Sequence, residues 1–568
     1  MKSQAAVKIG KSFYQTLISL DAVACIFVFL FSLALGIAAR GFLDIDSTWD
    51  EANYLRRGLE YGTSGSLPPP SWAPIYSIWY AIVNSISPSP IDAYYTNIAA
   101  ISTGLATTLY LFLRRVGASL LSSLVVSVFF TLSASNIYLV PRVSSFALLI
   151  LLAGSTLALY FRNLTIKMLS LFMFFTTLAV YVRPEFALSW LLLLGAVIVV
   201  IFKRRILGLR LFARHEVRYF LASILFAALA FKYFGSPVDG SRSIFAFAQH
   251  FKNNYDAWNG TVTHGWGFEA FKLAFGDSKS LINAAVANPH LFAKHLYYNI
   301  MHNMPRAARG VFAPELPYLG STLRKVIPIA VVCAFGVFLW RKLRKTRSAT
   351  IDLLMIIRNY KSFLNKSFRI AWPLILVLTP PAISSIVIFP RSHYMVFAWP
   401  IISIMAAGAI EAVLASFADL NYSRWLGLRF PRAIYILAAA LFMYFNIAIF
   451  TYSRSTPHLY AIESLRSLKI RPPASIVDSG VRYSSYLGSG FEGVHFHEKS
   501  QDESCSDFIL RKRIDYVVAT FDDLINPGIV GNKSCEIIKG SPELAEISPG
   551  IFLFDLRHRM DTDKAGTF

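Results

Sequence analysis

Long apolar runs constrain this chain more than any other feature of its sequence. A helix that crosses a membrane needs about 20 mostly apolar residues, and the 568-residue chain contains about eleven runs that approach this length. The composition agrees, because 55% of the residues are hydrophobic and 15% are charged, whereas soluble domains carry roughly 25% charged residues. We predict an α-helical polytopic membrane protein with spans at residues 18–39, 93–113, 118–138, 143–161, 168–182, 185–202, 219–235, 326–340, 371–389, 394–415 and 433–452.

The basic residues between these runs predict which side of the membrane each loop occupies. Cytoplasmic loops of membrane proteins carry an excess of Lys and Arg, which also accounts for the formal net charge of +22. Basic clusters follow every second span, as at Arg114–Arg115, Lys203–Arg205 and Arg341–Arg347. With an odd number of spans, we expect a cytoplasmic N-terminus and an extracytoplasmic C-terminus, in a bacterial inner membrane. Nucleic acid is not an expected partner, because no basic stretch is interleaved with exposed aromatic residues.

The outer loop at residues 41–92 is expected to fold as two helices. Apolar residues in its first part are spaced like one helical stripe, at Trp49, Ala52, Leu55 and Leu59. Pro68–Pro70 break the chain, and the aromatic segment at 71–85 that follows is too short to span a membrane. Because Trp and Tyr favour the headgroup region, we predict that both helices lie in the membrane interface.

The C-terminal tail differs from the rest of the chain. Three short β-rich runs, "ASIVDSG", "IDYVVAT" and "IFLFDLR", are separated by polar and helical stretches. They predict a small extracytoplasmic α/β domain at 456–568, after a transmembrane domain at 1–455 whose second large outer loop is 236–325. The tail also contains Cys505 and Cys535, which either form a disulfide in an oxidising compartment or remain two unpaired thiols.

Several basic residues are predicted at the outer ends of spans, where the positive-inside trend does not explain them. They are Arg142 in "YLVPRVSSF", Arg183 in "YVRPEF", and Arg391 with His393 in "IFPRSHYMVFAWP". An arginine presents a planar fork that suits phosphate oxygens, so residues converging at one membrane depth could bind a lipid phosphate. The alternative is that each arginine anchors its span at the interface or pairs with an acid such as Glu185.

Two adjacent acids, Asp50 and Glu51, follow the first span and allow two interpretations. Thr48 and Glu51 match a capping box, and Asp50 would lie where the helix dipole favours an anion, so both acids could simply begin a helix. Alternatively, an ionised Asp50 at the membrane surface could accept a proton from an acceptor hydroxyl or amine during group transfer.

Four segments in matching order resemble the GT-C superfamily of integral-membrane glycosyltransferases, particularly the protein O-mannosyltransferase and lipid A aminoarabinose transferase group. They are "TWDEANYLRRGLEYG", "PPPSWAPIYSIWYAIV", "YVRPEFALSWLLLL" and "RSHYMVFAWPIISIMAAGAI", and the resemblance covers residues 15–455. It implies a GT-C-like fold and inverting transfer of a hexosyl or pentosyl group from a polyprenyl phosphate to a protein or glycolipid acceptor. Asp50 would take the catalytic role, with Glu51 at the partner position of the pair. The "RSHY" segment resembles the family's segment near the donor phosphate, which points to Arg391 and His393.

This sequence departs from the family pattern in one respect, since some members have a further acid after the third span. Here that position offers only Ser144 and Ser145. Tyr54 in the first outer loop, and His264 and Trp266 in the second, are candidates for binding sugar or acceptor, because loops carry function. For the second loop the alternative is an ordinary folded segment.

No cofactor is expected, and no essential metal. Oxygen ligands for Mg²⁺ or Mn²⁺ could come from four acids in the first outer loop, namely Asp44, Asp46, Asp50 and Glu51. Acids this close in sequence are more often solvated than assembled around an ion, so we favour a metal-free site.

Two other classes of function remain open. A transporter or flippase for a lipid-linked glycan would usually carry ionisable residues within the membrane, and internal repeats. The predicted spans are nearly free of acids, with Asp21 and Glu411 toward span ends, and contain no evident repeat. A non-catalytic scaffold that binds through the tail would not need outward arginines or the Asp-Glu pair.

Overall fold

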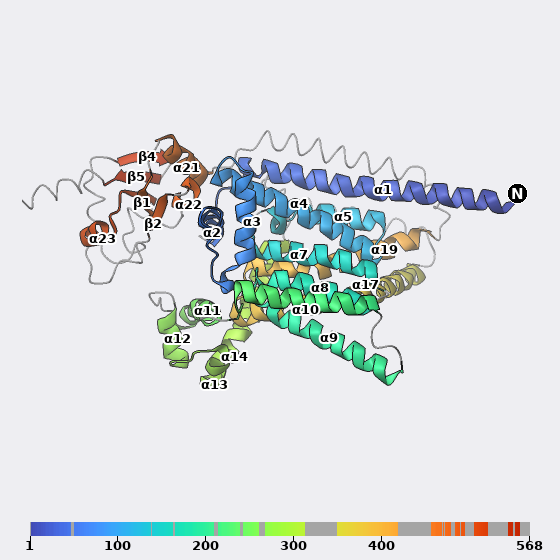
Figure 1. Cartoon of the computed structure of the whole chain (residues 1–568). Helices are drawn as coiled ribbons and strands as arrows, with labels where there is room; N and C mark the ends of the chain where they lie inside the picture. The colour runs from blue at the N-terminus through green and yellow to red at the C-terminus, as the bar shows by residue number, and fades with distance from the viewer. Residues whose placement is uncertain are drawn as a thin grey trace, which may run out of the picture. The chain divides into compact units, whose positions relative to one another are not determined.

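The computed structural model describes residues 2–46, 50–137, 139–162, 165–208, 214–238, 242–260, 267–312, 349–418, 456–468, 470, 472–478, 483–488, 490–494, 505–520, 544–548 and 551–556. Its contacts divide the chain into two compact units (Figure 1). The first unit comprises Met1–Gly36, Pro69–Pro74 and Ala99–Thr451. The second comprises Ile37–Pro68, Ile75–Ile98 and Tyr452–Phe568, so the predicted first outer loop is grouped largely with the predicted C-terminal domain.

Seven helical segments of the described chain are long and apolar enough to cross a membrane. They lie at Leu20–Gly41, Pro90–Val116, Val143–Phe161, Phe186–Ile206, His215–Phe234, Leu354–Ile388 and Ser392–Ala412. The prediction of a helical, multi-pass membrane protein is therefore confirmed. Helices α5 (Leu120–Thr131) and α8 (Thr165–Val180) coincide with two further predicted spans but have only 12 and 16 residues. The predicted spans at 326–340 and 433–452 lie outside the described residues, so the count of eleven stays a prediction.

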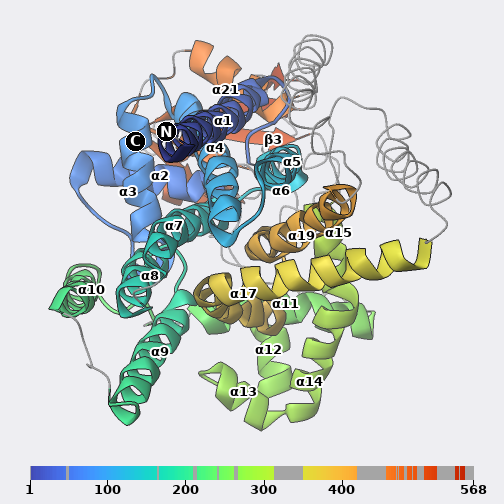
Figure 2. The same ribbon diagram turned by 90° about the vertical axis from the view of Figure 1, so that its right-hand side faces the viewer.

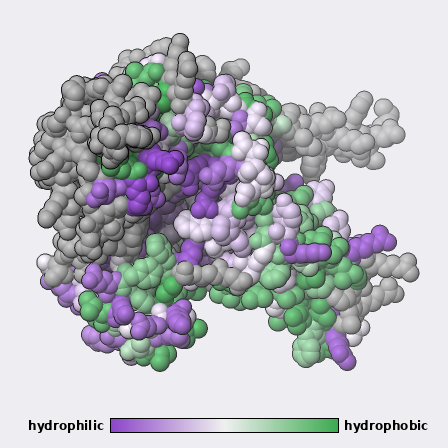
Figure 3. Space-filling model, turned by 60° about the vertical axis from the view of Figure 1, so that its left-hand side comes forward, coloured by the Kyte–Doolittle hydropathy of each residue, from purple (hydrophilic) through white to green (hydrophobic). Residues whose placement is uncertain are grey.

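Two neighbouring helices expose apolar side chains in a way that requires a lipid environment. Helices α9 (Phe186–Ile206) and α10 (Arg214–Phe234) both pack on α8. Their exposed side chains include Leu191, Ile198, Phe202, Leu225 and Phe231. Soluble proteins rarely expose apolar surface on this scale, and Figure 3 shows hydrophobic residues over much of the lower half of the surface in view. These helices therefore face lipid.

The long helix α17 (Ala349–Ile388) contains three prolines, and a neighbouring helix compensates for one of them. A proline cannot donate its backbone nitrogen to the carbonyl four residues earlier, so Pro381 leaves the carbonyl of Val377 without its usual partner. The hydroxyl of Ser189 on α9 donates to that carbonyl at 2.7 Å. Because Ser189 and the Val377 backbone are buried, this bond satisfies a polar group that water does not reach.

Part of the predicted outer loop at 236–325 is a group of short helices with its own core. The helices are α11 (Arg242–Asn259), α12 (Phe268–Phe275), α13 (Leu281–Ala287), α14 (Pro289–Tyr298), a π-helix (Asn299–Asn303) and α15 (Met304–Phe312). Figure 2 shows α11 to α14 gathered beside one end of α17. Phe247, Phe251, Phe271 and Phe275 form the centre of their core. This segment is an ordered platform, and it positions the residues that follow α17.

The first outer loop contains the two predicted helices, α2 (Asp50–Ser64) and α3 (Pro74–Ser85). Ala52 and Leu55 of the predicted apolar stripe are fully buried, while Trp49 lies outside the described residues. The helices approach closely at Gly58, where an added Cβ would lie 2.4 Å from the Cβ of Tyr80. The location of both helices in the membrane interface stays a prediction.

The C-terminal part of the second unit contains a five-stranded sheet with the order β2-β1-β3-β5-β4. Its strands are β1 (Ala474–Asp478), β2 (Phe491–Val494), β3 (Tyr516–Thr520), β4 (Leu544–Ser548) and β5 (Ile551–Asp555). Strand β1 is parallel to β2 and β3, and β5 is antiparallel to β3 and β4. The three predicted β-rich runs contain β1, β3 and β5, so a small α/β fold is confirmed here.

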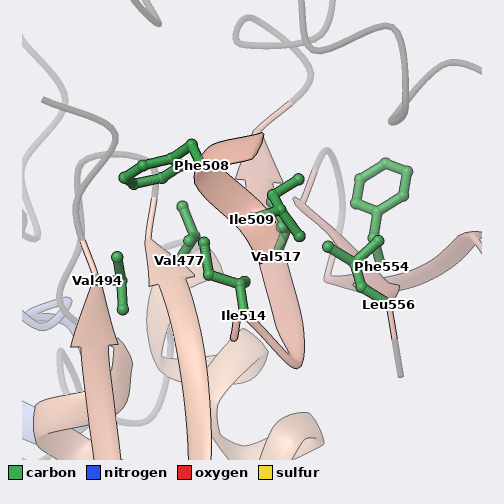
Figure 4. Packing of buried hydrophobic residues seen from close by; sticks show 8 residues of the cluster. All are labelled: Val477, Val494, Phe508, Ile509, Ile514, Val517, Phe554 and Leu556. Atoms are coloured by element: carbon green, nitrogen blue, oxygen red, sulfur yellow. The ribbon is translucent and has the colours of Figure 1, made fainter. Parts of the chain in front are cut away.

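Helices cover this sheet through an apolar core. Helix α23 (Cys505–Lys512) contributes Phe508 and Ile509, which pack with Val477, Val517 and Phe554 from the strands (Figure 4). Two further helices, α21 (Pro457–Ser467) and α22 (Tyr483–Leu487), contact β4 and β2 respectively.

Candidate functional site

The predicted Asp-Glu pair begins helix α2. Asp50 is the first residue of the helix and is half-buried, and Glu51 follows it. The backbone N–H of Glu51 donates to Oδ2 of Asp46 at 2.8 Å, so Asp46 satisfies one of the free N–H groups at the helix start. Thr48, the predicted N-cap, lies outside the described residues. Asp46 was not expected in this role, although the preference for Asp at helix starts is a usable signal.

The side chain of Glu51 is enclosed in a polar cage. Its Oε1 accepts hydrogen bonds from the hydroxyls of Tyr76 and Tyr80, both at 2.5 Å, and from Nδ2 of Asn97 at 3.0 Å. All four side chains are fully buried. Burial, reinforced by the charge of Glu51, raises the pKa of Tyr80 well above its usual range, which keeps its hydroxyl proton available for donation to Glu51. We call Glu51, Tyr76, Tyr80 and Asn97 the glutamate cage.

The cage differs from the simple helix start that the sequence suggested. Glu51 lies inside it, while Asp50 remains partly accessible next to it. Tyr54, a predicted substrate-binding residue, is buried and packs edge-on against Tyr76 with ring centroids 5.2 Å apart. In the described structure Tyr54 supports the cage, and its contact with substrate stays a prediction.

In the first unit, Arg183 lies in the turn between α8 and α9 and is held from several sides. Its guanidinium donates to Oε1 of Glu185, with Nε at 2.8 Å, and to the hydroxyl of Ser144 at 3.2 Å. The same group lies 4.4 Å from the centroid of the Tyr394 ring, a cation–π contact. The alternative prediction of a pair between Arg183 and Glu185 is therefore confirmed, and this pairing fixes the guanidinium in place.

The structure brings Arg183, Arg391 and His393 into one electrostatic group. Arg391 precedes the short helix α18 (Ser392–Met395), and the positive charges of both arginines act on the buried His393 ring. His250 of α11 joins this group and stacks on Phe389 with ring centroids 4.9 Å apart. Burial and the charge of Arg391 lower the pKa of His250 to about 3, so its ring is neutral at pH 7. Neither periodicity nor a motif in the sequence pointed to His250.

A buried network fixes the chain just before Arg391. The last carbonyls of a helix lack intrahelical partners, and here Nε2 of His295 donates to the carbonyl of Ile388 at 3.0 Å. Nδ2 of Asn299 donates to the carbonyl of Ile386 at 2.8 Å, and Asn254 and Asn303 extend the network. Burial lowers the pKa of His295 to about 4. Helix α14 and the π-helix that follows it therefore cap α17.

Arg183 lines one of two cavities that share lining residues. One has a volume of about 280 Å³ and is lined by Arg183, Glu185 and Arg242, together with hydroxyl groups from Ser71, Ser243, Ser384, Ser385 and Tyr394. The other, of about 470 Å³, is lined mainly by apolar residues of α8, α9 and α10, including Val180, Leu191 and Phe231. Pro237 and Val238 line both. The polar cavity thus lies next to an apolar groove.

Arg242 is the second arginine of the polar cavity, and the sequence did not single it out. Its Nη1 donates to the backbone carbonyl of Ser71, and its guanidinium lies 4.4 Å from the centroid of the Trp72 ring. With one acid and two arginines, the lining has a formal net charge of +1. Such a lining favours an anionic group.

Arg142 is committed to the protein backbone. Its fully buried guanidinium donates to the carbonyls of Asn136 and Ile137 and to the hydroxyl of Ser102 at 3.2 Å. It therefore braces the turn before α7 (Val143–Ala158), and a contact with donor phosphate stays a prediction for this residue.

Other predicted site residues fall outside what can be described. His264, Trp266 and Cys535 lie outside the described residues, as does the side chain of Cys505. Within the described ranges, no three His, Cys, Asp or Glu side chains gather as a metal-ligand set.

Comparison with models of known protein families and with curated proteins finds no match to this chain.

Proposed function

We propose that this protein is a glycosyltransferase that moves a sugar from a polyprenyl-phosphate donor to a protein or glycolipid acceptor at the outer membrane surface. The observation that carries the proposal is that a cavity lined by two arginines shares two lining residues with an apolar groove between membrane helices. A polyprenyl phosphate has the same two parts, an anionic head and a long apolar chain. The motif resemblance described above supplies the sugar-transfer chemistry.

The donor would be held by different forces at its two ends. Arg183 and Arg242 would donate charge-assisted hydrogen bonds to phosphate oxygens, and their stacking on Tyr394 and Trp72 reduces the entropy lost when they bind. The prenyl chain would bury its methylene and methyl groups in the groove, each worth about 0.8 kcal/mol. Arg391 adds positive potential near the same region.

In the reaction, an acceptor oxygen or nitrogen attacks the anomeric carbon of the sugar. The bond from that carbon to the phosphate oxygen breaks, with inversion, and polyprenyl phosphate leaves. Asp50 accepts the acceptor's proton, and the arginines stabilise the negative charge that develops on the phosphate. Glu51 acts through the glutamate cage, which fixes the first turn of α2 and hence the position of Asp50.

A transporter or flippase is less well supported by the described spans. Asp21 forms a two-point ion pair with Arg114, with both N–O distances at 2.8 Å. At the start of α5, Glu411 accepts hydrogen bonds from the backbone N–H of Ser119 and from the hydroxyl of Ser122, each at 2.6 Å. Both acids therefore have structural partners, which leaves them poorly suited to carry a coupling ion.

The proposal is tested by measuring binding of undecaprenyl phosphate to the purified full-length chain by native mass spectrometry. Arg183→Ala and Arg242→Ala should each weaken binding by about tenfold or more, since a hydrogen bond to a charged group contributes about 1.5–3 kcal/mol. Arg183→Lys should recover only part of the loss. The matched control is Arg306→Ala, because Arg306 is exposed on α15 and does not line the cavity.

Transfer itself is tested with polyprenyl-phosphate sugars and with glycan mass spectrometry of a strain lacking the gene. Loss of one glycan in that strain, restored by the wild-type chain but not by the Asp50→Asn chain, supports the proposal and identifies sugar and acceptor. Unchanged glycans, together with equal lipid binding by all arginine variants, would refute it.

A further inference from the structure

A separate cavity of about 710 Å³ lies within the second unit. It is formed by α2, β1, β2, α22 and the turn between α23 and β3. Its volume falls within the range of about 300–1,000 Å³ that is typical of ligand pockets. None of the residues assigned above to sugar transfer lines it. We call this the sheet-edge cavity, because β2 is the edge strand of the sheet.

The sheet-edge cavity is lined by many charged residues, and their charges balance. Three basic and three acidic residues line it, namely Arg56, Lys512 and Arg513, and Glu60, Glu492 and Asp515. An anionic ligand would meet three carboxylates, and a cationic ligand would meet three basic groups. A neutral ligand that both donates and accepts hydrogen bonds can bond to both kinds of group.

Several polar groups of this cavity have unused hydrogen-bonding capacity. The hydroxyl of Ser485 is 2% exposed and has no hydrogen-bond partner among the described residues. Asp515 accepts from the backbone N–H of Ser475 through Oδ2, at 2.8 Å. The Glu492 and Arg513 side chains are exposed, and within the described part of the chain neither forms an ion pair. A buried hydroxyl without a partner is costly, so a ligand that reached Ser485 would remove that cost.

Backbone geometry holds the charged side chains at the cavity. Arg513 has a φ of +50°, a left-handed backbone conformation that residues other than glycine rarely adopt. Gly490, with a φ of +94°, lies so close to Pro472 that an added Cβ would come within 2.8 Å of its Cβ. Strained residues persist where the surrounding structure fixes them, and they cluster at binding sites.

We propose that the sheet-edge cavity binds a neutral oligosaccharide. Sugar hydroxyls act as donors and acceptors at once, so they match paired carboxylates and basic groups as well as the Ser485 hydroxyl. Phe491 adds an aromatic ring to the lining, on which the apolar face of a sugar ring can pack. This inference is independent of the transferase proposal, because it rests on residues to which that proposal assigns no role.

The experiment uses the full-length protein in nanodiscs, since maltoside detergents carry a sugar headgroup that would compete. Saturation-transfer NMR is recorded with three probes, mannotriose, chitotriose and maltotriose, and with trigalacturonic acid as a charged comparison. At least one neutral probe should bind, and Glu492→Gln and Arg513→Gln should each weaken that binding by about tenfold. Both side chains are exposed, so these substitutions leave the fold intact.

The matched controls are Glu546→Gln on β4, the opposite edge strand, and Arg466→Gln on α21. Both residues are exposed and lie outside the cavity lining, so neither change should affect binding. The proposal is overturned if no neutral probe binds, if trigalacturonic acid binds in preference, or if the cavity variants bind as well as wild type. Binding of undecaprenyl phosphate by the same variants should be unchanged, which separates this test from that of the transferase.

Discussion

Removing the Glu51 carboxylate, the hydrogen-bond acceptor at the centre of the glutamate cage, should destabilise the protein strongly. Glu51→Ala would leave three buried donors, on Tyr76, Tyr80 and Asn97, without the oxygen to which all three donate. An orphaned buried donor costs about 1–3 kcal/mol. Nδ2 of Asn97 also lies 2.9 Å from each phenol oxygen, so the three groups can partly satisfy one another. We therefore expect a loss of about 3–5 kcal/mol in the free energy of unfolding.

Tyr80→Phe should cost less, because it removes a single hydrogen bond to a carboxylate. Such bonds contribute about 1.5–3 kcal/mol. In the double variant Glu51→Ala/Tyr80→Phe, one orphaned donor is absent, so the double change should cost less than the sum of the single changes. The difference should be about 1–3 kcal/mol, which is the coupling expected between residues in direct contact.

The assay is SDS titration of the solubilised full chain, followed by tryptophan fluorescence, for the four members of this cycle. Tyr94→Phe is the matched control, since Tyr94 is fully buried and its hydroxyl has no hydrogen-bond partner among the described residues. That change should be neutral or slightly stabilising. Additive losses in the cycle, or an equal loss from Tyr94→Phe, would refute the cage as the origin of the effect.

Three further predictions concern the reaction, pH and α17. Asp50→Asn should lower the rate of sugar transfer by about 10²–10⁴-fold, with donor binding unchanged; a loss of threefold or less would assign Asp50 to the helix start alone. His250 and His295 have pKa values lowered to about 3 and 4, so the unfolded chain binds more protons below pH 6.5, and stability should fall as pH drops from 6.5 towards 4. The slope should be roughly 1.4 kcal/mol per pH unit for each histidine, and a pH-independent midpoint in SDS titration would contradict it. Ser189→Ala should cost about 1–3 kcal/mol by orphaning a buried α17 carbonyl, whereas Thr379→Ala, which removes only a local bond on the exposed side, should cost much less in the same titration.

Hydropathy and strand patterns predicted much of the fold. The long apolar runs predicted the membrane-crossing helices, and the short β-rich runs in the tail predicted β1, β3 and β5. Both patterns are local, since each follows from how one segment meets lipid or a core. Strands β2 and β4 were missed because their sequences, "FEGV" and "LAEIS", have weak β patterns.

The site was less predictable, because its residues meet through tertiary contacts. Arg183 could be named from its position at a span end, but neither Arg242 nor His250 belongs to a motif, and each is brought into place by the fold of α11. The capping-box pattern correctly suggested a helix start near Asp50, yet it could not reveal the cage. Three of the cage's four members lie 25 to 46 residues from Glu51 in sequence.

The compensated proline in α17 has a mechanical consequence for the polar cavity. One wall of that cavity is lined by Pro381, Ser384, Ser385 and Ile388. These residues lie at or after the position where α17 lacks a backbone hydrogen bond, because Pro381 has no N–H to donate. The wall can therefore tilt against the preceding turns without breaking an intrahelical hydrogen bond there, at the expense of the bond from Ser189. Losing that bond orphans the buried Val377 carbonyl and costs about 1–3 kcal/mol, roughly two to five times the thermal energy. A bulky headgroup could thus enter by bending a helix, with no loop having to open.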